Sequence, residues 1–296
     1  QDSKLLSVRW REEDRHMVLE DFAMNALCAA GTGSFLDQQA ERLGISIDRD
    51  FARIAMESAT PARVAGRCTV FAKSDMIHLQ QEGTPLPDIL AGLCLALARN
   101  FRSVIGKGKP FVAPILFQGG VAYNRAVVRA FEEVLGLGEG ELIVPVHHEL
   151  MAALGAARVG ADDAGRGGGA TFAGFHLLDA PLHAPSGSRK TLPALGRGIP
   201  GNGGPPAGRH EATDASASRV VCARPGVRAG GNGGRVRGNG SRLTGYLGVD
   251  VGSISTNGVV IDDENRVLGR RYLPTAGKPL DAVRAGLLEV GLELGE

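Results

Sequence analysis

Residues 248–256 read GVDVGSIST, which predicts a β-strand, a glycine turn rich in hydroxyl groups and a returning strand. Gly252 lets the backbone approach a phosphate closely, and the N–H groups and hydroxyls of such a turn can donate hydrogen bonds to it. Asp250, at the end of the first strand, suits a hydrated magnesium ion. A Walker loop differs because it needs a helix and a lysine after its glycines. A plain hairpin turn would explain Gly252 alone, so the combination predicts phosphate binding.

Two parts of the chain show the strand and helix patterns typical of an α/β fold. In residues 1 to about 160, a hairpin is expected at Lys4–Arg9 and Met17–Met24. Apolar residues with helical spacing follow, and the expected helices include one that begins near Ser74 and a small-residue helix at Glu149–Val159. In residues 244–296, the strands around the predicted phosphate loop precede a helix at Pro279–Leu294. The chain therefore predicts two ordered α/β regions.

Residues 160–243 lie between these regions and show no periodic pattern. Glycine, proline and arginine punctuate the stretch, which cannot bury enough apolar surface to offset the entropy lost on ordering. A long disordered linker is therefore expected. An RNA-binding Arg/Gly tail is the less favoured alternative, because no aromatic residue is interleaved with the Arg-Gly steps.

The composition narrows the classes of function. The formal net charge of the 296 residues is +1, which gives no general attraction to nucleic acid or to an anionic membrane. No run of 18 apolar residues occurs, so no membrane span is expected. The four cysteines lack the paired spacing of a secreted framework, which favours a reducing, cytoplasmic compartment. The chain begins with Gln1 instead of methionine, so we expect a piece of a longer protein.

Cys28 and Cys68 each stand at the start of an expected helix. The positive end of a helix dipole stabilises a thiolate, which is the form that binds metal. Two such ligands cannot fill the four positions of a tetrahedral zinc or a cubane iron–sulfur cluster, whereas a second copy of the pair across a twofold axis can. Two ordinary half-buried thiols are the alternative, because the 40-residue spacing fits no zinc-finger or ferredoxin pattern.

A second glycine turn follows an expected buried strand at Ile115–Phe117. Gly119 and Gly120 would let a nucleoside lie against the backbone, and Asn124 is expected to cap the next helix. An ordinary strand-to-helix turn has the same pattern, so this signal is weaker. Two other features are interpreted as structural: Cys94 as a buried small hydrophobic residue, and the pair at residues 147–148 as surface or hinge histidines.

Together these segments resemble the ATP-dependent activators of 2-hydroxyacyl-CoA dehydratases and the related ATPase subunits of benzoyl-CoA reductases. The resemblance covers residues 1–159 almost throughout. The matching motifs are QDSK at 1–4, CAAGTG at 28–33, CTVFA at 68–72, GGVA at 119–122 followed by Asn124, and ELMAALGAA at 149–157. The family has an actin-like ATPase fold of the actin, Hsp70 and sugar-kinase superfamily, which is ribonuclease H-like, so the resemblance implies this fold.

The resemblance also implies an order of domains. Residues 1–159 correspond to the last two-thirds of an activator ATPase domain, 160–243 to the linker, and 244–296 to the start of a second such domain. A fragment of a tandem-domain protein is the simplest explanation, and a circular permutation is less favoured. The actin-like fold is therefore expected to be incomplete.

By resemblance, the function is that of an ATP-hydrolysing activator that injects an electron into a 2-hydroxyacyl-CoA dehydratase or benzoyl-CoA reductase-type enzyme. The implied cofactors are ATP, magnesium and a 4Fe–4S cluster that Cys28 and Cys68 share with a second subunit or domain, as a homodimer or intrachain pair. Asp250 would orient magnesium-bound water, and Gln1 would position the attacking water. The phosphates would be held by Gly252, Ser253, Ser255 and Thr256, and the nucleoside by Gly119, Gly120 and Asn124.

The sequence departs from the family pattern at several positions. Asn257 stands where a lysine usually follows the Ser/Thr run, and Lys73 stands where an acidic residue is common. Ala26 and Leu27 replace the polar pair before the first cysteine. Two other functions stay open: a cluster-free, actin-like small-molecule kinase, and an inactive fragment.

Overall fold

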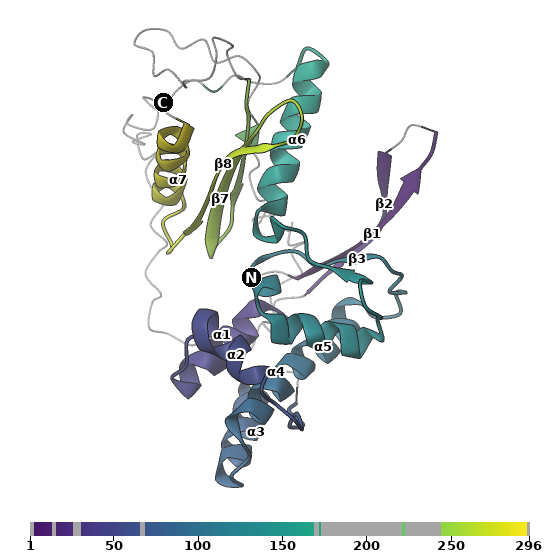
Figure 1. Cartoon of the computed structure of the whole chain (residues 1–296), viewed down its shortest axis with the longest axis vertical. Coiled ribbons are helices and arrows are strands. Elements are labelled where there is room, and N and C mark those ends of the chain that lie inside the picture. Colours follow the sequence, from purple (N-terminus) through teal and green to yellow (C-terminus); the bar gives the residue numbers. More distant parts are fainter. Residues whose placement is uncertain are drawn as a thin grey trace, which may run out of the picture. The chain divides into compact units, whose positions relative to one another are not determined.

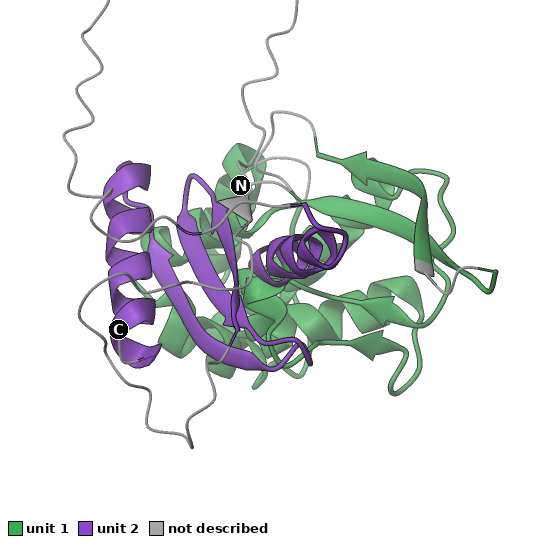
Figure 2. Cartoon of the chain, turned by 90° about the horizontal axis from the view of Figure 1, so that it is seen from above, with its two compact units in different colours: residues 1–151 green, residues 152–296 purple. Residues whose placement is uncertain are grey.

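The computed structural model describes residues 3–13, 16–25, 31–65, 69–168, 172, 221–222 and 244–294. The chain forms two compact units, residues 1–151 and residues 152–296, whose elements are labelled in Figure 1 and coloured by unit in Figure 2. Gln1, Cys28 and Cys68 lie outside the described residues, as does most of the expected linker. Within the described ranges, no helix is both long enough and apolar enough to cross a membrane.

Unit 1 combines two small sheets with a group of helices. Strand β1 (Lys4–Arg11) pairs antiparallel with β2 (His16–Met24), and β3 (Ile115–Leu116) pairs parallel with β4 (Leu142–Ile143). The helices are α1 (Gly33–Leu43), α2 (Ala52–Ala55), α3 (Thr69–Gln81), α4 (Leu86–Asn100) and α5 (Arg125–Leu135). Shorter helical turns lie at Ile47–Phe51, Phe101–Ile105, Gly120–Tyr123 and His148–Leu150.

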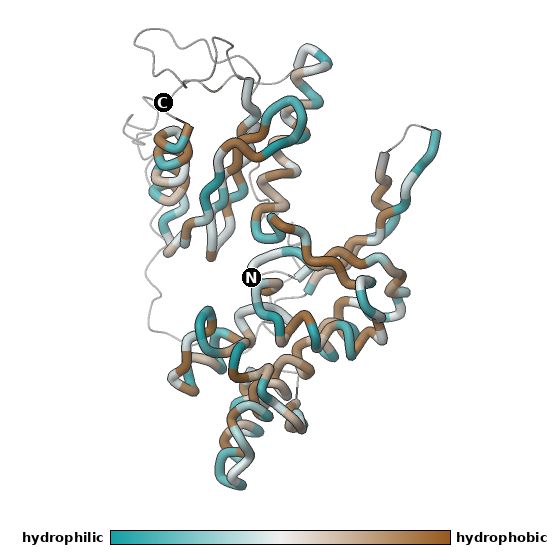
Figure 3. The backbone as a smooth tube through the Cα atoms, in the orientation of Figure 1, coloured by the Kyte–Doolittle hydropathy of each residue, from teal (hydrophilic) through white to brown (hydrophobic). Residues whose placement is uncertain are grey.

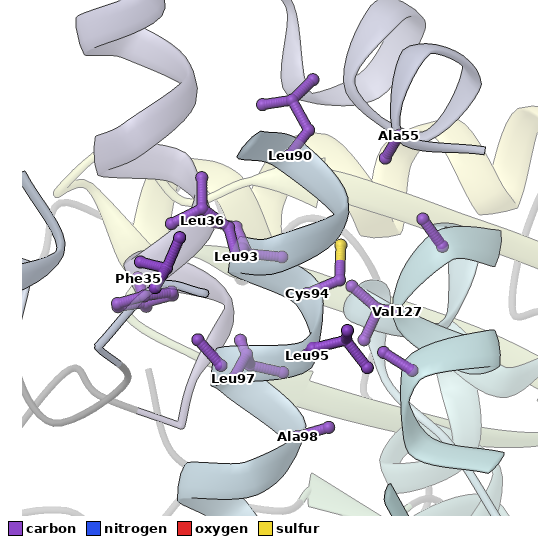
Figure 4. Packing of buried hydrophobic residues seen from close by; sticks show 14 of the residues in the cluster. Phe35, Leu36, Ala55, Leu90, Leu93, Cys94, Leu95, Leu97, Ala98 and Val127 are labelled. Carbon is purple, nitrogen blue, oxygen red and sulfur yellow. The ribbon is translucent and has the colours of Figure 1, made fainter. Parts of the chain in front are cut away.

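Helix α4 forms the centre of the core of unit 1 (Figure 4). Its residues from Ile89 to Ala98 are buried apart from Ala91, and Phe35 of α1 and Val127 of α5 belong to the same cluster. Burial raises the pKa of the Cys94 thiol to about 12. The thiol therefore stays protonated at neutral pH, which confirms the expected role of Cys94 as a buried hydrophobic residue.

Unit 2 is a four-stranded antiparallel sheet with helices packed against it. The strand order is β5 (Val221–Cys222), β6 (Tyr246–Val251), β7 (Ser255–Ile261) and β8 (Val267–Pro274). Helix α6 (Met151–Gly165) precedes the sheet in sequence, and α7 (Pro279–Leu294) follows it. Figure 3 shows hydrophobic segments along these strands and at β3 of unit 1.

The two helices of unit 2 cover opposite faces of the sheet, as Figure 1 shows. Ala153 and Ala157 of α6 pack with Tyr246, Val259 and Ile261 on one face. On the other face, Gly269 of β8 lies against Val290 and Leu294 of α7. Because side chains of a strand alternate between faces, β7 contributes to both cores.

Gly248 allows the close approach of α6 to the sheet. A Cβ atom at this position would lie 2.0 Å from the carbonyl oxygen of Ala153 and 2.5 Å from the nitrogen of Ala157. Real Cβ contacts are never this short, so only glycine fits between β6 and α6. The small residues of α6 and Gly248 together set the spacing of helix and sheet.

Most of the predicted elements are confirmed, and several boundaries differ. Helix α7 has the predicted bounds, and α1 ends before Gly44, whose φ of 67° is left-handed as in a glycine C-cap. Helix α3 begins at Thr69, whereas the sequence pattern predicts a start near Ser74. Helix α6 continues to Gly165, past residue 160, because Ala161 and Ala164 add to the core of unit 2.

Candidate functional site

The predicted phosphate loop is a tight turn between β6 and β7 in unit 2. The N–H of Gly252 donates to the carbonyl oxygen of Ser255 at 2.8 Å and closes the turn. Ser253 and Ile254 form the tip, and both are exposed. Asp250 lies opposite Asn257 in the strand register. The strand, turn and returning strand therefore have the form that the sequence predicts.

Thr275, which follows β8, binds the turn from beneath. Its N–H donates to the carbonyl oxygen of Ile254 and its hydroxyl to that of Gly252, each at 2.7 Å. The Thr256 hydroxyl lies 2.9 Å from the Thr275 hydroxyl. Since the single hydrogen of Thr275 goes to Gly252, Thr256 must be the donor between the two threonines.

Thr256 thus differs from the serines of the turn. It is 3% exposed, and its hydrogen is already donated within the protein. Ser253 is exposed and Ser255 is half-buried. Of the hydroxyls assigned to phosphate by resemblance, those of Ser253 and Ser255 are the ones available to a ligand, and Thr256 supports the turn from inside.

Asp250 carries the negative charge of this loop. The Nδ2 of Asn257 donates to Oδ2 of Asp250 at 3.3 Å. Asn257 is 4% exposed, and its own Oδ1 has no hydrogen-bond partner in the described part of the chain. No cationic side chain of the described residues pairs with Asp250. A partly exposed carboxylate without a cationic partner has the chemistry to bind a hydrated magnesium ion.

The second glycine turn lies in unit 1, between β3 and α5. Gly119 has φ of 103°, a conformation that favours glycine, and its N–H donates to the carbonyl oxygen of His148 at 2.7 Å. The Nδ1 of His148 lies 2.9 Å from the carbonyl oxygen of Gly119. Because a carbonyl can only accept, Nδ1 must carry the hydrogen.

Asn124 caps helix α5, as the sequence predicts. Its Oδ1 accepts hydrogen bonds from the N–H groups of Ala126 at 3.1 Å and Val127 at 3.2 Å. The Nδ2 of Asn124 is buried and has no acceptor within the described ranges. Asn124 therefore holds the start of α5 with its oxygen, while its amide hydrogens stay available to another group.

A pocket of about 520 Å³ opens beside this turn. Tyr123 and His148 stack edge to face there, with ring centroids 4.3 Å apart. His148 is only 8% exposed, so its interpretation as a surface residue is wrong. Sequence reasoning missed it because its partner, Gly119, is distant in sequence. The pocket is lined by Met56, Ala122, Tyr123, Arg125, Val128, Arg129, Glu132, Val144 and His148.

The two cysteines assigned to a metal are not among the described residues, but the helices that follow them are. Helix α3 begins at Thr69, directly after Cys68, and the N-cap of α1 is Thr32. A helix that begins directly after Cys68 fits a thiolate ligand there, because the dipole favours negative charge at a helix start, whereas Cys28 precedes Gly33 by five residues. The described residues contain no group of three or more histidine, cysteine or acidic side chains that could hold a metal.

The described neighbours of the cysteines do not lie together at one helix end. Arg42, in the last turn of α1, reaches the carbonyl oxygen of Thr69 at 3.4 Å. The start of α3 therefore lies near the end of α1, and the start of α1 lies about 14 Å from that end by helix rise. Shared ligation by Cys28 and Cys68 stays a prediction.

The structure places the residues predicted to bind nucleotide in two separate loops. Gly119, Gly120 and Asn124 belong to one loop of unit 1. Residues 250–256 belong to one hairpin of unit 2. Gln1, assigned to water positioning, is outside the described residues.

Comparisons with known proteins give relatives for the first part of the chain. The 2-hydroxyisocaproyl-CoA dehydratase activator of Clostridioides difficile is 35% identical over 164 residues, covering 55% of this chain and 58% of the relative. The (R)-2-hydroxyglutaryl-CoA dehydratase activating ATPase of Acidaminococcus fermentans is 38% identical over 121 residues, covering 40% and 45%. The chain spans about half the length of the curated relatives that it matches.

A solved structure also aligns with the chain. The activator of the 2-hydroxyisocaproyl-CoA dehydratase from Clostridium difficile with bound ADPNP aligns with a TM-score of 0.44 and 33% identity, covering 51% of this chain and 52% of that chain. Residues 11–160 match the sequence profile described as the BadF/BadG/BcrA/BcrD ATPase family. The expected family and its α/β, actin-like fold class are confirmed. The chain belongs to the BadF/BadG/BcrA/BcrD ATPase family.

Proposed function

We propose that this chain is part of an ATP-hydrolysing iron–sulfur activator that passes an electron to a 2-hydroxyacyl-CoA dehydratase or benzoyl-CoA reductase-type enzyme. The observation that carries the proposal is the family match over residues 11–160, a range that contains both Cys28 and Cys68. Relatives named as activators of dehydratases support the class of partner.

The turn at residues 252–255 supports the nucleotide part of the proposal. Its exposed tip offers backbone N–H groups and serine hydroxyls to a phosphate, and Asp250 offers a carboxylate to magnesium-bound water. On the nucleoside side, the loop at Gly119 and Gly120 offers backbone, and the Nδ2 of Asn124 offers a free donor. Gln1 stays the proposed residue for positioning the attacking water.

The start of α3 directly after Cys68 supports the metal part. Two thiolates per chain leave a four-coordinate cluster half-ligated, so a second subunit or domain must contribute the other two. When bound, a 4Fe–4S cluster supplies a centre that accepts and releases one electron. The role of this chain is to hold that centre by its thiolates and to couple nucleotide binding to the geometry of the paired chains. A cytoplasmic location and a homodimer or intrachain pair complete the proposal.

Anaerobic reconstitution with iron and sulfide tests the cluster. The chain is expected to become brown with broad visible absorbance and to bind about two irons per chain. Cys28→Ala and Cys68→Ala are expected to lose the colour. Cys94→Ala is the matched control, because its thiol is buried in the core and keeps its proton. Retained colour in both of the first two variants would refute the ligand assignment.

The same preparation separates the other functions. Colourless protein with sugar- or acid-dependent ATP turnover would favour the small-molecule kinase. Neither colour nor nucleotide binding would favour the inactive fragment. Reduced, coloured protein that passes an electron to an acceptor only with ATP present would support the activator.

A further inference from the structure

The geometry points to Thr275 as a positioning residue of the phosphate loop. By binding two carbonyl groups of the loop, Thr275 turns two backbone N–H groups outward, toward a phosphate-bearing ligand. The inference rests on the proposed nucleotide-binding function of the loop. Thr275 lies outside the motif GVDVGSIST, in the connection between β8 and α7. It is 3% exposed and therefore acts on the loop from within the fold.

Thr275 holds two carbonyl groups of the turn in place. Its hydroxyl holds the oxygen of Gly252 and its N–H holds the oxygen of Ile254, each at 2.7 Å. The hydroxyl of Thr256 donates to the same Thr275 oxygen, so the Thr275 hydrogen is directed at Gly252 without competition. One buried side chain and its own backbone thus determine the direction of two peptide groups.

The direction of these carbonyls decides where the neighbouring N–H groups point. In a planar trans peptide, the C=O of one residue and the N–H of the next lie on opposite sides. The peptides at Gly252 and Ile254 are trans, since the cis bond in the described residues is Ala113–Pro114. With both oxygens turned toward Thr275, the N–H groups of Ser253 and Ser255 turn away from it.

The tip of the turn keeps its donors unused. Of the two N–H groups turned outward, that of Ser253 has no acceptor within the described residues, and neither has the N–H group of Ile254, a residue that is 52% exposed. Several N–H groups converging at one turn form the anion-binding concavity common at phosphate sites. If Gly252 and Ile254 rotated their carbonyls outward, oxygen atoms would face the phosphate and repel it.

Thr275 is itself held in place by the start of α7. The N–H of Lys278 donates to the Thr275 carbonyl at 2.8 Å, and the intervening Ala276 and Gly277 have φ of 48° and 73°. This connection forms a defined turn between β8 and the helix, and it keeps the Thr275 hydroxyl under the loop.

The test compares three variants of the whole chain. Thr275→Val keeps the volume but removes the hydroxyl, and Thr275→Ser keeps the hydroxyl. Val290→Ala is the control for general loss of stability, because Val290 is 3% exposed in α7 and lies against Gly269 of β8. The measurements are hydrogen exchange of the peptide spanning residues 250–258 and affinity for Mg-ATP.

We expect Mg-ATP to slow exchange at the loop of the unmodified chain. Thr275→Val should speed loop exchange and weaken Mg-ATP binding about tenfold, the effect of one lost hydrogen bond of about 1.4 kcal/mol. Thr275→Ser should restore both within about twofold of the unmodified chain. Val290→Ala should leave the loop and the affinity unchanged while it lowers stability.

The outcomes separate this inference from the proposed function. If Mg-ATP protects the loop but Thr275→Val binds it as well as the unmodified chain, the positioning role is wrong and the nucleotide function stands. Equal losses of Mg-ATP affinity in Thr275→Val and Val290→Ala would also refute the positioning role, because a general loss of stability would then explain both. If Mg-ATP does not protect the unmodified loop, the proposed nucleotide site is wrong, and the role of Thr275 is refuted with it.

Discussion

Gly248 shows how a single position can determine the packing of a whole layer. A methyl group there would overlap the carbonyl of Ala153, and backbone atoms cannot move aside as a flexible side chain can. We expect Gly248→Ala to lower the free energy of unfolding of unit 2 by about 2–3 kcal/mol, since overpacking strains both helix and strand. Hydrogen exchange of peptides from β6 and β7 in low denaturant would measure the loss.

Gly258 provides the matched control in the neighbouring strand. A Cβ atom at Gly258 would have no heavy atom within 4 Å. Gly258→Ala should therefore change the stability of unit 2 by less than about 1 kcal/mol. Similar effects of both substitutions would mean that α6 does not pack on Gly248.

Asp88 makes the stability of unit 1 depend on pH. The hydroxyl of Ser58 donates to Oδ1 of Asp88 at 2.6 Å, and the N–H and hydroxyl of Thr60 also bind this carboxylate, at 3.2 and 3.4 Å. The Ser58 bond above all lowers the pKa of Asp88, against the opposing effect of burial. The folded state therefore binds this proton less readily than the unfolded state does.

The direction in which stability changes with pH follows from the lowered pKa of Asp88. Because the folded pKa is depressed, the stabilisation is fully present above the unfolded pKa of about 3.9 and is lost as the pH falls through the lower, folded value. Denaturation by urea should show a fall in stability below about pH 4 that is reduced in Asp88→Asn. Ser58→Ala should raise the pKa of Asp88, so an unchanged pH profile in that variant would contradict the assignment.

The roles of the hydroxyls show what residue type alone can and cannot predict. The pattern at residues 252–256 identifies a phosphate-binding turn, but it treats Ser255 and Thr256 alike. Adjacent residues of a strand point to opposite faces, so one of them had to turn inward. The partner of Thr256, Thr275, lies 19 residues away, and no local pattern predicts a contact over that separation.

At the scale of elements, Asn124 has two proposed roles: it caps the start of α5 and it contacts the nucleoside. Asn124→Ala should destabilise the start of α5 by about 1 kcal/mol, because two helix N–H groups lose their acceptor. Asn124→Asp should keep the cap, since a carboxylate oxygen accepts the same bonds and suits the helix N-terminus. The aspartate lacks the amide hydrogens, so it should still weaken nucleotide binding.

Thermal unfolding and nucleotide titration of both variants would distinguish the roles. Normal stability with weakened binding in Asn124→Asp would support a nucleoside contact through Nδ2. Normal binding by this variant would restrict Asn124 to capping.

Local signals predict most elements of this chain, and contacts at a distance explain the exceptions. Proline and apolar spacing predict both bounds of α7, and asparagine predicts the start of α5. Helix α6 is longer than its pattern predicts, because Ala161 and Ala164 gain stability from a sheet about 80 residues later. Small residues give no strong periodic signal, so packing decides where such a helix ends.

At the scale of the whole molecule, unit 2 is assembled from two distant stretches of sequence. Helix α6 ends at residue 165 and strand β6 begins at 246, yet Ala153, Ala157, Tyr246 and Val259 share one core. A specific protease site placed at residues 190–196 tests this assembly. After cleavage, the two pieces should elute together from a sizing column and separate in urea.

Gly248→Ala provides the contrast for this experiment. In the cleaved chain it should release the two pieces without urea, since the packing between α6 and β6 is what joins them. Separation of the pieces in the cleaved but otherwise unmodified chain would contradict the shared core.

The division of the chain illustrates the limit of reading domains from composition. A change in composition predicts a region with a different character at residues 160–243, but it does not tell which ordered parts associate. Gly248 and the alanines of α6 stand in motifs that the sequence analysis names, but neither motif predicts that they pack together, and their fit appears only when helix and sheet are in contact. Association of distant segments depends on shape, which a composition profile does not contain.

The packing of the alanines of α6 against β6 has a consequence for solutions of this protein at high concentration. The fit of α6 to the sheet depends on the shapes of the two surfaces and not on whether they belong to the same chain. Helix α6 of one molecule therefore fits the sheet of another molecule as well as its own. Reciprocal exchange of α6 would then give dimers that form slowly, persist after dilution and contain the same contacts as the monomer.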